Sequence, residues 1–67
     1  MTPTELKEAR LRLGLTLEQM ATMLRFSGSG RRQHAWSLEN GRRKMGDERA
    51  ELVKAYLSGY RPADWPR

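Results

Sequence analysis

The chain has 67 residues, which is enough for one small domain and too few for two separate hydrophobic cores. It has no cysteine and one histidine, which excludes disulfides, thiolate metal sites and a metal site made of histidines alone. No apolar run is long enough to cross a bilayer, and the N-terminus lacks the basic-then-apolar pattern of a signal peptide, so we expect a cytoplasmic protein with no membrane contact.

The formal charge of +5 is concentrated in one segment, residues 25–44. This segment holds six of the 13 Lys and Arg residues but only one of the eight acidic residues. The rest of the chain is therefore neutral. A charge run is usually a solvated face, but its concentration around one short polar segment favours a polyanionic partner.

Two capping boxes predict the starts of the first two helices. In each, a threonine, Thr2 or Thr16, precedes Glu5 or Gln19 by three positions, so side chains and backbone can bond reciprocally. Gly14 predicts a left-handed end to the first helix. The inward positions at helical spacing are Leu6, Ala9 and Leu13 in the first helix, and Met20, Ala21, Met23 and Leu24 in the second.

The segment Ser27-Gly28-Ser29-Gly30 is a loop by composition. It does not fit a phosphate-cradling glycine motif, which would need glycine where Gln33 stands. No serine has the glycine spacing of a nucleophile elbow, and no Ser-His-Asp set or fitting carboxylate pair is present. We expect no enzymatic activity, no metal and no cofactor.

A third helix is predicted from Arg31 to Glu39, ended by Asn40-Gly41, with Ser29 as its N-cap. Ala35 and Leu38 are three positions apart and should face inward. The opposite face should carry Arg32, Gln33, Trp36 and Ser37. This face is polar apart from one aromatic ring.

The basic turn Arg42-Arg43-Lys44 leads to a fourth predicted helix, which begins near Gly46-Asp47 and is closed by Gly59. One apolar stripe contains Ala50, Val53 and Leu57, and a second contains Leu52, Tyr56 and Tyr60. The second stripe is either a subunit contact or a wider core. We expect a domain over residues 1–59 and a Pro-rich, extended tail over 60–67, with Trp65 as an anchor or a further dimer contact.

The stretch "LKEARLRLGLTLEQMATML" followed by "AWSLENG" resembles the Cro and phage-repressor (XRE-type) helix-turn-helix DNA-binding family over roughly residues 6–57. The resemblance implies an all-α fold, a compact four- to five-helix bundle of the lambda-repressor-like kind. It implies that residues 16–24 cross the DNA backbone and that residues 31–40 form the recognition helix. Arg10 and Glu39 match positions that commonly form a structural ion pair.

The resemblance and the chemistry of the side chains together suggest which residues contact DNA. An Arg fork fits guanine and a Gln amide fits adenine, whereas cations and small polar groups fit phosphates. The predicted base-reading residues are Arg31, Arg32, Gln33, Trp36 and Ser37. The predicted backbone contacts are Thr16, Gln19, Ser27, Ser29, His34, Asn40, Arg42, Arg43 and Lys44.

Two of these residues have an alternative interpretation. Trp36 either contacts a thymine methyl, a sugar or a phosphate, or packs on the Gly-Ser loop. His34 either touches a phosphate or is a partly packed side chain, which is the commoner role.

Two features depart from the family pattern. Leu17 stands where a polar residue usually meets a phosphate. The turn between the two helices is several residues longer than usual, which makes the Gly-Ser segment an insertion that either contacts phosphates or bulges without contacts.

The resulting hypothesis is a small sequence-specific DNA-binding regulator, a homodimeric autorepressor of an inverted-repeat operator, with half-sites about 34 Å apart. The possible dimer contacts are Leu52, Tyr56, Tyr60 and Trp65. No small-molecule ligand is evident. The alternatives are an antitoxin or other protein-partner module of the same fold, and nonspecific nucleic-acid or RNA binding.

Overall fold

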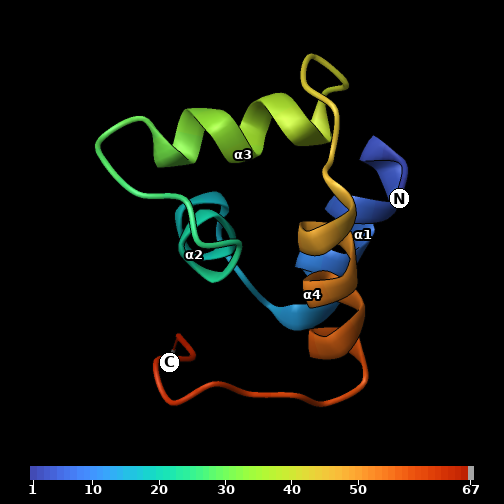
Figure 1. The fold of residues 1–67 in the computed structure, drawn as a ribbon, viewed down its shortest axis with the longest axis vertical. Coiled ribbons are helices and arrows are strands. Elements are labelled where there is room, and N and C mark those ends of the chain that lie inside the picture. Colours follow the sequence, from blue (N-terminus) through green and yellow to red (C-terminus); the bar gives the residue numbers. More distant parts are fainter. Residues whose placement is uncertain (67) are drawn as a thin grey trace.

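The computed structural model describes residues 1–66, and these form four α-helices and no strand. The helices are α1 (Pro3–Leu13), α2 (Leu17–Met23), α3 (Arg31–Glu39) and α4 (Asp47–Leu57) (Figure 1). The all-helical class is confirmed. A fifth helix is wrong for the described residues, because the chain after α4 forms turns instead. No helix among residues 1–66 is both long enough and apolar enough to cross a bilayer.

Both predicted capping boxes form. The Thr2 hydroxyl accepts from the backbone N–H of Glu5 at 3.1 Å, and the Glu5 carboxylate accepts from the backbone N–H of Thr2 at 2.8 Å. Thr16 and Gln19 repeat the pattern at 3.1 and 3.0 Å. The hydrogen bond to Thr2 lowers the pKa of Glu5 below its usual value. Gly14 ends α1 with φ 71°, the left-handed conformation that favours glycine.

The starts of α3 and α4 have no side-chain cap. The N-cap of α3 is Gly30, not Ser29, and Ser29 remains exposed in the loop. Gly46 precedes α4, where Asp47 and Glu48 place negative charge in the first turn. The first turn of α3 holds no acid and begins with two arginines, Arg31 and Arg32, so positive side chains stand at the positive end of the helix dipole.

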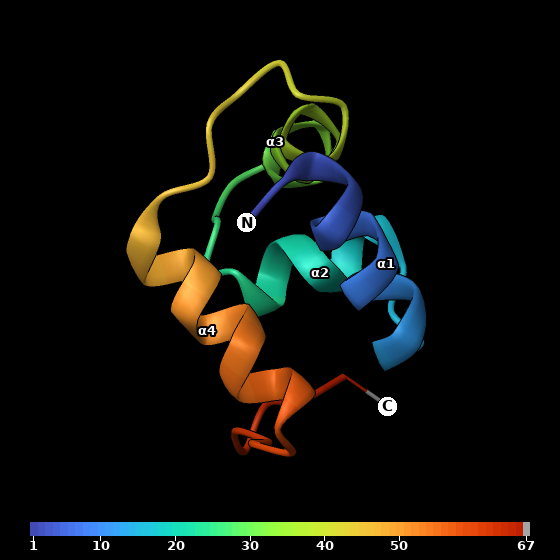
Figure 2. The same cartoon turned by 90° about the vertical axis from the view of Figure 1, so that its right-hand side faces the viewer.

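The core lies where α3 crosses α1 and α2 and where α4 packs on α1 (Figures 1 and 2). α3 forms one end of the molecule, and the C-terminal tail crosses the other end. The fully buried side chains of the core are small or apolar apart from one tyrosine: Leu6, Met20, Ala21, Met23, Leu24, Ala35, Val53 and Tyr56. Leu13 and Phe26 pack against this cluster from its edges.

The buried residues of α4 come from both of the apolar stripes predicted for this helix. The buried stripe is Ala50, Val53 and Tyr56, while Leu57 is 40% exposed. The prediction of Tyr56 as a dimer contact is wrong. Its ring is fully buried, and its hydroxyl donates to the backbone oxygen of Met23 at 2.7 Å. Leu52 is partly buried against the core, and among the α4 and tail residues predicted at a dimer contact only Tyr60 is exposed.

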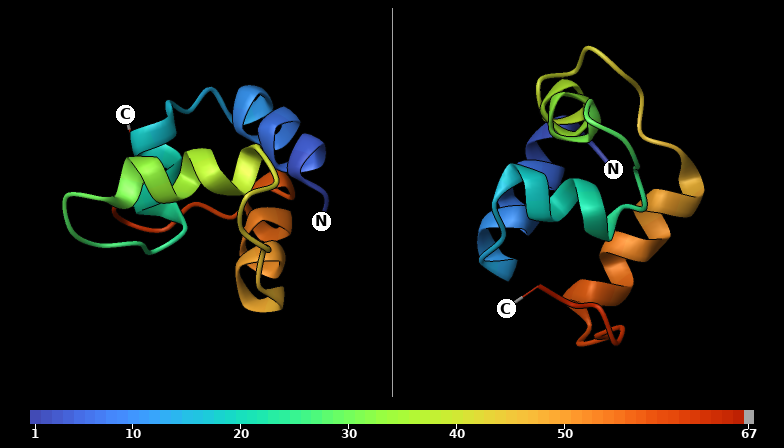
Figure 3. Two further views of the ribbon diagram at one scale, coloured as in Figure 1. Left: turned by 90° about the horizontal axis from the view of Figure 1, so that it is seen from above. Right: turned by 90° about the vertical axis from the view of Figure 1, so that its left-hand side faces the viewer.

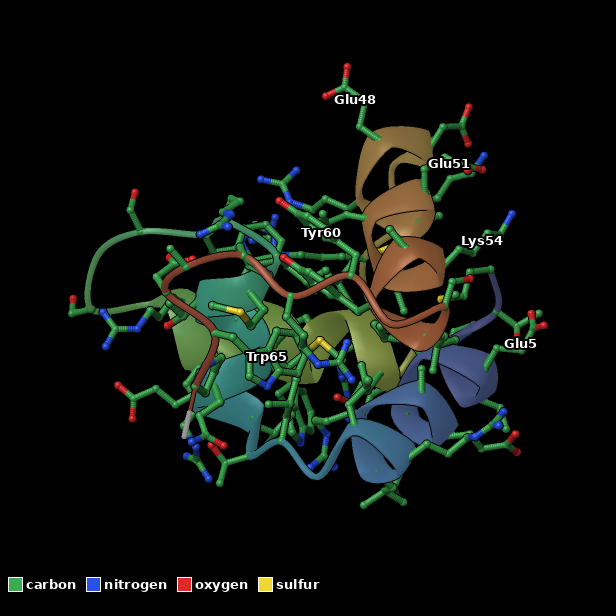
Figure 4. The ribbon with its side chains drawn as sticks, turned by 90° about the horizontal axis from the view of Figure 1, so that it is seen from below. Glu5, Glu48, Glu51, Lys54, Tyr60 and Trp65 are labelled. Carbon is green, nitrogen blue, oxygen red and sulfur yellow. The ribbon has the colours of Figure 1, made fainter. Side chains whose placement is uncertain are left out.

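The tail folds back instead of extending. Trp65 packs edge-on against Tyr56, with ring centroids 5.0 Å apart, so its anchoring role is confirmed and it packs against the core of this chain. The Arg61 guanidinium lies 4.2 Å from the Trp65 ring centroid. In Figure 4, the tail crosses the lower face of the helices with Tyr60 and Trp65 along it. Residues 60–66 therefore pack on the domain predicted to end at residue 59; residue 67 lies outside the described residues.

Candidate nucleic-acid interface

The outward face of α3 presents three of the side chains predicted to read bases. Arg32, Gln33 and Trp36 are exposed, while Ala35 and Leu38 on the opposite side are buried. The face contains an arginine fork, an amide and an indole, with no carboxylate among them. Trp36 is 37% exposed, and the Arg42 guanidinium lies 5.6 Å from its ring centroid. The indole is therefore a surface group beside a cation, an arrangement that leaves it accessible to a ligand.

Ser37 does not belong to this face, and its prediction as a base-reading residue is wrong. It is 8% exposed, and its hydroxyl donates back to the backbone oxygen of Gln33 at 3.0 Å. The chain after α3 turns back over this position, because the N–H groups of Arg42 and Arg43 both point at the Ser37 carbonyl, at 2.9 and 3.4 Å. Ser37 is therefore buried and bonded within its own helix, although helical spacing alone places it outward.

The basic turn extends the positive surface beyond α3. Arg42, Arg43 and Lys44 are exposed, and within residues 1–66 none of them forms an ion pair. The two N–H bonds to Ser37 fix the turn, and Gly41 makes it possible with φ 73°. Cations that no acid neutralises attract an anionic polymer most strongly.

Arg31, the first residue of α3, is partly buried and paired. Its Nη2 donates to the Glu18 carboxylate of α2 at 2.7 Å. The Nε group of Arg31 is shielded from solvent and has no hydrogen-bond partner in the described part of the chain. Of the two arginines that open α3, only Arg32 is exposed and free of an ion pair among residues 1–66.

The loop between α2 and α3 is anchored at its beginning and exposed at its tip. Arg49 of α4 donates from Nε to the Leu24 oxygen at 2.9 Å, and its guanidinium lies 4.1 Å from the ring centroid of Phe26. The other partner of Phe26 is His34 of α3, with ring centroids 4.0 Å apart and planes inclined by 18°. This Arg49–Phe26–His34 stack ties α4, the loop and α3 together. Ser27 and Ser29, predicted to contact phosphates, are exposed beyond it.

Of the two roles predicted for His34, phosphate contact or partial packing, the structure shows a partly packed side chain. Its half-buried setting lowers its pKa, and the nearby charges of Arg43 and Arg49 lower the pKa further. The lowered pKa favours the neutral form of the ring, which stacks on Phe26 and in that form contributes no charge to the surface.

Three further residues predicted at the DNA backbone retain donors for a ligand. The Thr16 hydroxyl accepts the N–H of Gln19 and keeps its own hydrogen, and the Gln19 side chain uses its oxygen in the capping box and keeps its amide hydrogens. Asn40 is exposed and gives one amide hydrogen to the Trp36 oxygen at 2.8 Å, which leaves the second.

The predicted ion pair between α1 and the end of α3 forms. Arg10 Nε lies 2.8 Å from the Glu39 carboxylate, and the two side chains are 15% and 4% exposed. Arg10 also donates from Nη1 to the Leu15 oxygen at 3.0 Å. One guanidinium thus links α1, the α1–α2 turn and α3, so the pair fixes the orientation of the helix that carries the exposed face.

Three tertiary contacts around the interface have no signal in the sequence. They are Glu18 with Arg31, Arg49 with Phe26, and the tail residue Asp64 with Arg25. In the last pair, two nitrogens of the Arg25 guanidinium lie 2.6 and 3.3 Å from the carboxylate oxygens of Asp64. Arg25 has φ 67°, an uncommon conformation for arginine, directly before Phe26. Its hydrogen bond lowers the pKa of Asp64 below the usual value. These partners lie 13 to 39 positions apart along the chain, beyond the reach of helical periodicity.

Among residues 1–66, no three His, Asp or Glu side chains come together in a way that could hold a metal ion. Comparison with protein-family models, with curated proteins and with solved structures finds no match for this chain. The geometry and charge of the surface around α3 are therefore the features that indicate a function for this chain.

Proposed function

We propose that this protein is a sequence-specific double-stranded DNA-binding transcriptional regulator, a small dimeric autorepressor of an inverted-repeat operator. The observation that carries the proposal is the exposed face of α3. It offers Arg32, Gln33 and Trp36 to solvent beside Arg42, Arg43 and Lys44, with no ion pair to these cations among residues 1–66. A helix with this face fits the major groove, which is about 12 Å wide.

In the proposed complex, α3 lies in the groove with its N-terminal turn deepest. Arg32 reads guanine O6 and N7 by a bidentate contact, and Gln33 reads adenine N6 and N7 in the same way. Each such contact gives roughly 1–3 kcal/mol of discrimination against the wrong base. Trp36 lies one turn further along and contacts a thymine methyl or a sugar.

The phosphates on either side are held by two separate groups. The turn after α3 supplies Arg42, Arg43 and Lys44, while the start of α2 supplies the Thr16 hydroxyl and the Gln19 amide. These contacts fix the register of α3 and carry no sequence information. They also make binding weaken as the salt concentration rises.

Two exposed apolar side chains near the C-terminal end of α4 support a dimer. Leu57, the last residue of α4, and Tyr60, three positions after it, are 40% and 53% exposed, and a second copy would cover these apolar groups. Two copies related by a two-fold axis would place two α3 helices in successive major grooves, about 34 Å apart. Occupying such a site at a promoter would block polymerase.

The experiment that tests the proposal is selection of bound sites from random duplex DNA with the purified protein. An enriched inverted repeat is the expected result, and it reports sequence reading and dimerisation together. Gln33→Ala should lose the preference at one or two base pairs of each half-site and keep the remainder. If the protein enriches no sequence at moderate salt, the proposal fails, and equal binding of all duplexes or of RNA would indicate a nonspecific nucleic-acid protein.

The same exposed Leu57 and Tyr60 support a second candidate, an antitoxin or other protein-partner module. In that case the pair binds a different protein in place of a second copy. A monomer in solution that prefers no duplex would favour this candidate.

A further inference from the structure

One acidic side chain is paired with a cation of the proposed reading helix. The Glu18 carboxylate of α2 lies 2.7 Å from Arg31 Nη2 at the first turn of α3, and the two side chains are 58% and 38% exposed. α2 and α3 pack against each other. The right view of Figure 3 shows α3 directly above α2. The remaining cations of the surface, Arg32 and the turn 42–44, form no ion pair within the described residues. Arg31 is therefore the one cation of this surface that an acid restrains among residues 1–66.

The restraint determines which atoms of Arg31 can reach a ligand. A guanidinium has five N–H donors in a fixed plane. Glu18 takes a hydrogen of Nη2, and Nε is shielded from solvent. Nη1 and the second hydrogen of Nη2 form no hydrogen bond among residues 1–66, and the edge between the two Nη groups of a guanidinium can contact two acceptors at once. Guanine presents two such acceptors, O6 and N7, in the major groove.

We propose that Glu18 is a specificity-determining residue that positions Arg31 to read a base and keeps it from phosphates. This inference depends on the proposed function and extends it to a residue of α2. In the specific complex the ion pair persists, and the outer edge of Arg31 contacts guanine. The pair holds the side chain in this position, so Arg31 can swing toward a phosphate elsewhere on the duplex only by breaking the pair with Glu18. The carboxylate thus weakens nonspecific binding, and it leaves specific binding intact.

The experiment compares wild-type protein with Glu18→Gln, Arg31→Ala and the double variant. Each is titrated with its selected operator and with random duplex DNA over a series of salt concentrations. Without the carboxylate charge, Arg31 is free to bind phosphates. Glu18→Gln should therefore lower the ratio of operator to random-duplex affinity by about two- to fivefold, the range of exposed ion-pair energies. Its salt dependence on random duplex should steepen by up to about 0.9 in log-log slope.

The double variant tests whether the effect passes through Arg31. In the Arg31→Ala background, Glu18→Gln should leave the affinity ratio unchanged, because the residue it releases is absent. Glu51→Gln is the matched control. It removes another exposed acid, paired with Lys54 at 3.3 Å on α4, and both side chains project away from the packed helices in Figure 4. This control should leave the ratio at its wild-type value.

Two results would overturn the inference while the proposed function stands. The first is an equal gain on operator and random duplex in Glu18→Gln, which would make Glu18 a simple repulsive charge. The second is an undiminished effect in the Arg31→Ala background. A wild-type protein that binds its selected DNA no better than random duplex refutes the proposed function, and this inference with it.

Discussion

The ion pair between Arg10 and Glu39 allows a quantitative test of how α3 is held. Glu39→Ala removes a carboxylate whose side chain is 4% exposed and leaves the Arg10 guanidinium, at 15% exposure, with only its bond to the Leu15 oxygen. Breaking a fully buried pair costs about 3–5 kcal/mol, and an exposed pair contributes at most about 1 kcal/mol. The exposed fraction of Arg10 and its remaining bond place this pair between these limits, at about 2–4 kcal/mol. A domain of this size has a total stability of about 3–10 kcal/mol, so the loss is a large part of it.

The assay is urea denaturation followed by circular dichroism, with the free energy of unfolding extrapolated to water. Arg10→Met together with Glu39→Met is the informative control, because apolar replacement of both partners removes the uncompensated charge. This double variant should recover most of the stability that Arg10→Met alone or Glu39→Met alone loses. The reasoning is refuted if Glu39→Ala costs less than about 0.5 kcal/mol, or if the double variant loses the sum of the two single losses.

Three other predictions concern the DNA contact, the core and pH. Arg43→Ala should weaken binding to all duplexes alike and reduce the slope of log affinity against log salt concentration by about 0.9. Lys54→Ala on α4 is the control and should change neither, and an unchanged slope in Arg43→Ala would exclude a phosphate contact at Arg43. Tyr56→Phe should lower the free energy of unfolding by about 1–2 kcal/mol in urea titrations, because it leaves the buried Met23 oxygen without its donor, and a neutral result would contradict this. The folded state lowers the pKa of His34, so its stabilising effect is complete above about pH 6.5 and is lost as pH falls through the folded-state value. His34→Phe keeps the stacked ring without a titrating group, and thermal melts between pH 7 and 5 should show a weaker pH dependence than wild type; an identical dependence would exclude His34 as its source.

The sequence determined the features that depend on neighbours within one helical turn. The capping boxes at Thr2 and Thr16 and the left-handed Gly14 involve hydrogen bonds over three or four positions, and their geometry follows from the helix itself. The bounds of α3 and the burial of Ala35 and Leu38 follow from the same periodicity. For this reason the number of main helices and the exposed polar face could be predicted.

Only the tertiary structure decided which borderline positions are buried and which charges are paired. Ser37 is buried although helical spacing places it outward, and Tyr56 is buried because Met23 supplies an acceptor and Trp65 closes the core from the tail. Helical spacing cannot distinguish a second stripe that faces solvent from one that faces another part of the same chain. The pair of Glu18 with Arg31 likewise arises where two helices cross, and the crossing depends on the packing of the whole core.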